Sequence, residues 1–142
     1  RDGTKKMSKS EESNYSRIEL KDTSDDIVKK IKKAKTDSDP IPDSKTKLLN
    51  RPEALNLLNI FSDITQTPME KILDQMAGKD FSFLKKELSD VLVTNICPIG
   101  NEIKKLLSDK SHLEAVLKKG KEKAQLKAEE NLKKIRDIVG LL

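Results

Sequence analysis

The strongest constraint on the fold is a long stripe of aliphatic residues whose spacing alternates between four and three. This spacing places every member on one face of an α-helix, whereas a strand would need alternation every two residues. The stripe keeps its phase through Pro98, so we expect a single helix kinked at that proline or two nearly continuous helices. Its members are Leu84, Leu88, Leu92, Ile96, Ile99, Ile103 and Leu106.

The composition supports a helical core. Three Phe, one Tyr and no Trp occur among 142 residues, so the core must be built from Leu, Ile, Val and Ala. That usage favours helices over a sandwich or a barrel. The length is sufficient for one domain with a real core. The sequence therefore predicts an all-α bundle of five to seven helices.

Start signals mark the shorter helices. Residues 23–26, Thr-Ser-Asp-Asp, supply a cap residue followed by two acids, which exposed amides and the helix dipole favour, and they predict a helix that ends near Thr36. Pro52 fits the first position of another helix, because its missing donor does no harm there. The cap of that helix is expected to be Asn50 or Arg51, and its inward-facing residues are expected to be Leu55, Leu58, Phe61 and Ile64. The T-x-x-E and S-x-x-E spacings at 67–70 and 111–114 predict two capping boxes.

Other segments are expected to be irregular or to end helices. Residues 36–50 contain two prolines and predict a loop. Gly120 is expected to interrupt the C-terminal helix, whose stripe runs from Ala124 to Val139, and Gly140 is expected to end it. Alternating polar and apolar residues at 17–20 predict one short strand.

The charge pattern leaves several partners open. The net charge of +5 permits contact with a polyanion but does not require it. Basic residues gather at 29–35 and 118–136, where they either follow a phosphate backbone or form a solvated face. No apolar run approaches the roughly 18 residues of a membrane span. Cys97 is the only cysteine, which fits a reducing compartment, and we expect a cytoplasmic protein.

Few side chains suit metal or nucleophilic chemistry. His112 is the only histidine, and with a distant Cys97 it cannot supply a normal ligand set, so no metal bound by the protein is expected. Glycine-rich nucleotide loops are absent. Asp37-Ser38-Asp39 lies in a loop, where functional residues often sit, but a turn rich in Asp and Ser is the simpler interpretation.

One pentapeptide carries chemistry: Lys6-Met7-Ser8-Lys9-Ser10. It places two ammonium groups, two hydroxyls and one flexible apolar side chain on one short loop. Lysine suits phosphate oxygens, and serine hydroxyls can donate to the same atoms. A specified pentapeptide arises by chance in a chain of this length about once in 10⁴. The alternative is a solvated Lys/Ser linker.

This pentapeptide, KMSKS, is the mobile-loop motif of class I aminoacyl-tRNA synthetases, and the whole chain resembles the C-terminal part of the bacterial-type tryptophanyl-tRNA synthetase family. The resemblance continues in the helix and T-D-S loop at 25–39, in the G-K segment at 78–85, in the P-I pair at 98–99 and in the closing pattern of 113–140. The tyrosyl-tRNA synthetase family shares the loop motif but not this sequel.

The resemblance implies a two-part homodimeric enzyme. Its Rossmann-type part carries an H-I-G-H motif, which does not occur in this sequence. Residues 1–20 would be the KMSKS loop with its lead-in, a remnant of that part, and residues 21–142 the helical domain with the anticodon-binding region. By itself this chain is then expected to be a monomeric, inactive fragment.

The resemblance also implies the roles of the loop. Lys6 and Lys9 would stabilise charge on the departing pyrophosphate, and together with them Met7, Ser8 and Ser10 would line ATP. The partners of the whole enzyme would be tryptophan, tRNA-Trp and ATP, which brings Mg²⁺ with it. The residues that contact tRNA are not assigned. A free-standing helical module that binds RNA or protein is the alternative.

Overall fold

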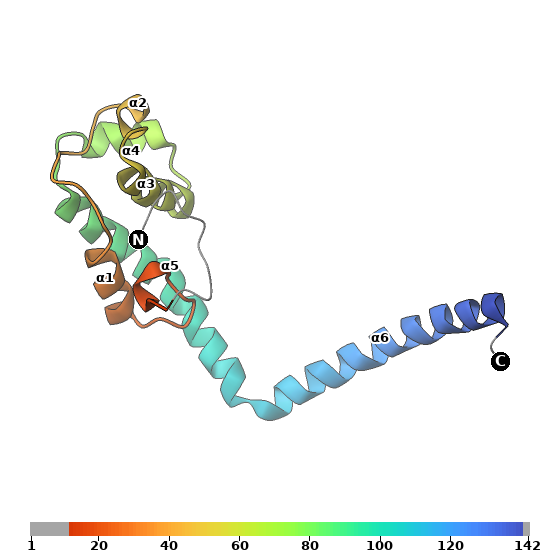
Figure 1. Cartoon of the computed structure of the whole chain (residues 1–142). Helices are drawn as coiled ribbons and strands as arrows, with labels where there is room; N and C mark the ends of the chain where they lie inside the picture. Colours follow the sequence, from red (N-terminus) through yellow and green to blue (C-terminus); the bar gives the residue numbers. More distant parts are fainter. Residues whose placement is uncertain (1–11, 141–142) are drawn as a thin grey trace. The chain divides into compact units, whose positions relative to one another are not determined.

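The computed structural model describes residues 12–140, which form one short 3₁₀ helix and six α-helices (Figure 1). They are η1 (Asn14–Ser16), α1 (Ser24–Lys32), α2 (Lys45–Leu48), α3 (Pro52–Thr65), α4 (Met69–Met76), α5 (Phe81–Ser108) and α6 (Lys110–Val139). No strand occurs in this part of the chain, so the all-α prediction is confirmed. The chain divides into two compact units, Arg1–Asn101 and Glu102–Leu142.

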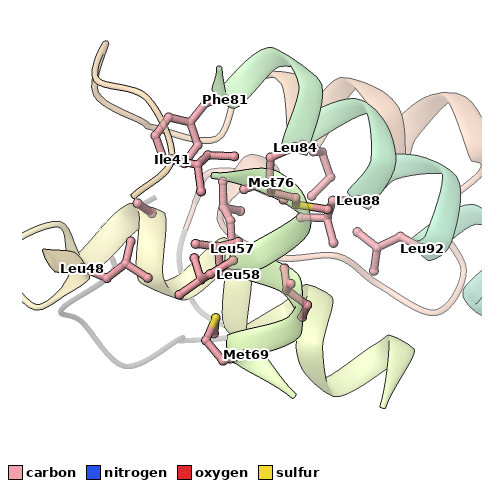
Figure 2. Close-up of a cluster of buried hydrophobic side chains, with 14 of the residues drawn as sticks. Ile41, Leu48, Leu57, Leu58, Met69, Met76, Phe81, Leu84, Leu88 and Leu92 are labelled. Carbon is pink, nitrogen blue, oxygen red and sulfur yellow. The ribbon is translucent and has the colours of Figure 1, made fainter. Parts of the chain in front are cut away.

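The core of the first unit is aliphatic, as the composition predicts. Figure 2 shows side chains from α2, α3, α4 and α5 converging on one cluster, with Ile41 contributed by the loop before α2. Burying each such side chain stabilises the fold by roughly 1.5–3 kcal/mol. The fully or almost fully buried members include Ile27, Ile41, Leu48, Leu58, Ile72, Leu73, Leu84, Leu88 and Leu92.

The first helix begins where the sequence predicts. The backbone N–H of Asp26 donates to the Thr23 hydroxyl at 3.2 Å, and the Thr23 N–H donates to the Asp26 carboxylate at 3.2 Å, which completes a capping box. Ile27 and Ile31 are buried. The helix ends at Lys32, four residues before the predicted end.

Helix α3 starts at Pro52 as predicted, but its buried face is broader than the expected stripe. Ala54 and Leu57 are buried alongside Leu58, whereas the predicted Leu55, Phe61 and Ile64 are only half-buried. Both α2 and α4 contact α3, so the helix buries more than one narrow stripe.

The two predicted capping boxes further along the chain do not form. Pro68 takes the N-cap position of α4, and the hydroxyl of Thr67 donates to a backbone carbonyl instead. Asp109 caps α6, where its carboxylate accepts the N–H of His112 at 2.9 Å. In each case a neighbouring residue occupies the cap position that the pattern assigned elsewhere.

The predicted short strand at 17–20 is wrong. Arg17 has extended backbone, but no neighbouring strand in the described chain pairs with it. Instead, the N–H of Glu19 donates to the Asp22 carboxylate at 2.8 Å and the Asp22 N–H donates to the Glu19 carbonyl at 3.0 Å. Hydrogen bonds within a local turn thus use the backbone N–H groups that would otherwise have paired with a neighbouring strand.

Of the three predicted helix-breaking positions in the long helices, only Gly120 behaves differently from expectation. Helix α5 is continuous through Pro98, as the stripe predicts. Helix α6 runs through Gly120 as well, so the predicted break there is wrong. A glycine inside a helix costs only about 1 kcal/mol relative to alanine, and strong helix formers flank this one. Gly140 ends α6 with a φ of 70°, as predicted.

Helix α6 contributes no buried residue. Its predicted aliphatic stripe is exposed in this chain, with Val139 retaining 59% of its accessible surface.

Candidate functional site

The predicted catalytic loop, Lys6, Met7, Ser8, Lys9 and Ser10, lies outside the described residues. The structure describes the segment that follows the loop, residues 12–22, and how that segment is held against the rest of the first unit.

Lys30 of α1 and Lys33, the C-cap residue of that helix, hold this segment. The Lys33 ammonium lies 4.0 Å from the centre of the Tyr15 ring, a cation–π contact. Lys30 forms an ion pair with Asp22 at 2.5 Å, with both side chains largely shielded from solvent. Such pairs are costly to break, because either partner alone would be a poorly hydrated charge.

Helix α5 holds the same segment through close packing. Gly100 is buried, and a Cβ built on it would lie within 3.0 Å of the Leu20 carbonyl oxygen. Only glycine allows this approach of backbone to helix. The chain immediately after the KMSKS loop is therefore fixed to both α1 and α5.

A cavity of about 300 Å³ lies between this segment and α1, α3 and α5. Its walls are mainly aliphatic, but several charged side chains also line it. Each of these charges has an opposite partner: Lys30 with Asp22, Lys35 with Glu53 at 3.7 Å, and Arg17 with Glu19 at 2.9 Å.

The acidic loop that the sequence singled out is held by Arg51. The guanidinium donates to both carboxylate oxygens of Asp37, one of them at 2.8 Å, and to the carbonyls of Asp39 and Pro40, each at 2.8 Å. It also lies 5.2 Å from the centre of the Phe81 ring. The sequence interpretation gave Arg51 only one role, as one of two possible caps of the next helix. Its distance along the chain from Asp37 left no local signal of the pairing.

The charged groups of this loop hold its backbone in place. The hydrogen bonds from Arg51 hold the pKa of Asp37 below its ordinary value. Ile41, at the end of the loop, exchanges two backbone hydrogen bonds with the turn after α4, to Lys79 at 2.9 Å and Gly78 at 2.8 Å. The arrangement supports the turn interpretation of Asp37-Ser38-Asp39 over a catalytic one.

A basic groove lies between α1 and the start of α5, with a volume of about 580 Å³. Lys85 stands within it and donates to the carbonyls of Ala34 at 2.7 Å and Lys32 at 3.4 Å, where α1 ends. Burial lowers the pKa of Lys85. The side chains of Lys32 and Lys86 also line the groove.

The remaining candidates stay apart. His112 is exposed near the start of α6, and Cys97 is half-buried at the edge of the core. Between residues 12 and 140, no group of three His, Cys, Asp or Glu side chains is placed to hold a metal ion. No helix in the described chain has the length and apolar character needed to cross a membrane.

Comparison with known proteins gives a consistent result. Residues 1–95 match the family model of "tRNA synthetases class I (W and Y)". The whole chain is 44% identical to a tryptophan–tRNA ligase of Rhizobium meliloti and 47% identical to one of Brucella melitensis, and it covers 40% of each. The chain thus spans about 40% of the length of the curated relatives it matches.

A solved structure is similar as well. The crystal structure of tryptophanyl-tRNA synthetase from Mycoplasma pneumoniae superposes with a TM-score of 0.71 at 28% identity, over 99% of this chain and 44% of that one. The similarity therefore extends through the helices that follow residue 95. On this evidence the chain belongs to the class I tRNA synthetases of the W and Y family.

Proposed function

We propose that this chain is the C-terminal part of a tryptophan–tRNA ligase. The observation that carries the proposal is 41–47% identity to tryptophan–tRNA ligases over essentially all of its residues, together with the KMSKS sequence at Lys6–Ser10. The whole enzyme would activate tryptophan with ATP and then charge tRNA-Trp. It would act as a cytoplasmic homodimer, and its remaining part would hold the tryptophan pocket.

In this proposal the loop supplies the electrostatic stabilisation of the activation step. Lys6 and Lys9 bind the phosphates of ATP, which arrives with Mg²⁺, and stabilise charge as pyrophosphate departs. Met7, Ser8 and Ser10 line the nucleotide. Residues 21–142 form the helical domain that contacts tRNA.

The attachment of residues 12–22 supports a mechanical role for the helices to which this segment is fixed. Contacts from Tyr15 to Lys33, Asp22 to Lys30 and Leu20 to Gly100 fix the chain directly after the loop. Movement of α1 and α5 would therefore carry the KMSKS loop with it. Closure of the loop over ATP would then be coupled to domain motion.

The test is a reconstitution experiment that measures tryptophan-dependent ATP–pyrophosphate exchange. The 142-residue chain alone should show no exchange, and addition of the N-terminal part of the ligase should restore it. Exchange by the chain alone would overturn the claim that it is inactive by itself. Tight RNA binding without any preference for tRNA-Trp, and no exchange in the longer protein, would favour a free-standing RNA-binding module instead.

A further inference from the structure

The basic groove between α1 and α5 differs from the cavity beside residues 12–22 in whether its charged side chains form ion pairs. Around that cavity, every charge named above has an opposite partner. In the groove, Lys32 and Lys86 are exposed, and neither forms an ion pair with any residue between 12 and 140. Two ammonium groups from helices far apart in sequence thus line one hollow and are available to an anion.

The groove also provides hydroxyl groups beside these charges. Ser82 and Ser89 line it, and the buried Ser89 hydroxyl donates to the Lys85 carbonyl at 2.6 Å, which leaves its oxygen as an acceptor. Ser82 is exposed and can donate. Three lysines face a single carboxylate, Asp90, so the groove is cationic.

Lys85 fixes the two helices that carry the free lysines relative to each other. Its ammonium donates to the carbonyls at the end of α1, so it joins α1 to α5 beside the groove. A cation at the C-terminal end of a helix is favoured by the helix dipole. Lys32 and Lys86 therefore project from two helices that are tied together, rather than from one freely moving surface.

From this geometry we infer that the α1–α5 groove binds a phosphate of the tRNA backbone through Lys32 and Lys86. The inference rests on the proposed function, which supplies tRNA as the polyanion. Exposed, unpaired lysines are suited to backbone phosphates, which position a nucleic acid without reading its sequence. The lysines of α6 differ, because acids are interspersed among them.

The first test removes the two free charges. The double variant K32Q/K86Q should bind a tRNA-Trp transcript roughly tenfold more weakly at moderate salt, and the slope of log K against log [salt] should fall by about 1–2. The matched control is K45Q/K71Q, which removes the same net charge from exposed positions on α2 and α4. Equal weakening by both variants would mean a net-charge effect only and would overturn the inference.

The second test is a substitution that should strengthen binding instead of weakening it. Replacing the groove carboxylate by Asp90→Asn should strengthen binding of the transcript about twofold to threefold, because a repulsive charge is removed. Asp74→Asn on α4 is the control and should change binding less. A tightening cannot result from misfolding, so an unchanged or weaker affinity for Asp90→Asn would count against the groove.

A third measurement separates this inference from the proposed function. Tryptophan-dependent ATP–pyrophosphate exchange requires no tRNA, so K32Q/K86Q in the longer ligase should exchange at the wild-type rate. Loss of transcript affinity with normal exchange supports the groove. Normal exchange with unchanged affinity overturns the groove but not the ligase. Absence of tryptophan-dependent exchange in the wild-type ligase overturns the proposed function itself.

Discussion

Gly100 of α5 lies so close to the backbone of Leu20 that a Cβ at position 100 would overlap the Leu20 carbonyl oxygen. The contact joins a helix to the segment that follows the KMSKS loop, and the atom that would have to move belongs to the backbone. Gly100→Ala should therefore destabilise the first unit by about 1–3 kcal/mol, even though alanine is the better helix former. Urea unfolding measures the change.

The matched control for this substitution is Gly120→Ala. Gly120 also lies inside a long helix, but no atom lies within 4 Å of a Cβ built there. Alanine at position 120 should be neutral or should stabilise the chain by up to about 1 kcal/mol. If both substitutions shifted the unfolding midpoint in the same direction, the close packing at Leu20 would have no energetic role.

Arg51 should be irreplaceable by lysine. Its guanidinium holds the Asp37 carboxylate and two carbonyls at once, a geometry that one ammonium cannot reproduce. Arg51→Lys should lower the free energy of unfolding by about 1–3 kcal/mol. Amide exchange at Ile41, whose N–H bonds to Lys79, should also become faster. Arg136→Lys on the exposed α6 is the control, and an equal effect of both changes would contradict this account.

The same pair predicts a dependence on pH. The pKa of Asp37 in the folded chain is lowered from the ordinary 3.8, so the stability it contributes is present at neutral pH and is lost as pH falls below that value. The difference in unfolding free energy between wild type and Asp37→Asn should be constant above about pH 5 and should shrink toward pH 3. A difference that grew on acidification would reverse the assigned sign.

Pro98 is expected to cost stability where it stands. It lies inside α5, is exposed, and cannot donate the backbone hydrogen bond that an interior helical residue normally makes. Pro98→Ala should raise the free energy of unfolding by about 1–3 kcal/mol, measured by urea unfolding of the 142-residue chain. A loss of stability would instead mean that the proline ring makes packing contacts that outweigh the restored hydrogen bond.

Sequence patterns predicted the elements whose causes are local. The helix start at 23–26, the start at Pro52 and the continuous helix α5 all follow from spacing within one or two turns, and each is confirmed. The stripe of α5 is buried only up to Leu92, because Ile99 and Leu106 are exposed. The predicted break at Gly120 was wrong because the cost of one glycine is small against a long run of helix formers.

Features that depend on distant residues were beyond such reasoning. The pairing of Arg51 with Asp37, the approach of Leu20 to Gly100 and the link from Lys85 to the end of α1 join residues separated by 14 to 80 positions. The broad buried face of α3 arises because two helices contact it. The roles of Lys6 and Lys9 remain predictions, since these residues lie outside the described part of the chain.

The central claim is that the KMSKS loop of this chain serves a tryptophan–tRNA ligase, and ATP–pyrophosphate exchange by the longer ligase tests it most directly. Exchange should depend on tryptophan and not on tyrosine. Lys6→Ala and Lys9→Ala should each reduce it about hundredfold or more, because they remove charge that stabilises the departing pyrophosphate. The neighbouring Lys5→Ala, outside the pentapeptide, should retain exchange within about threefold of wild type. Exchange that is independent of tryptophan, or unaffected by loss of Lys6 and Lys9, would contradict the account.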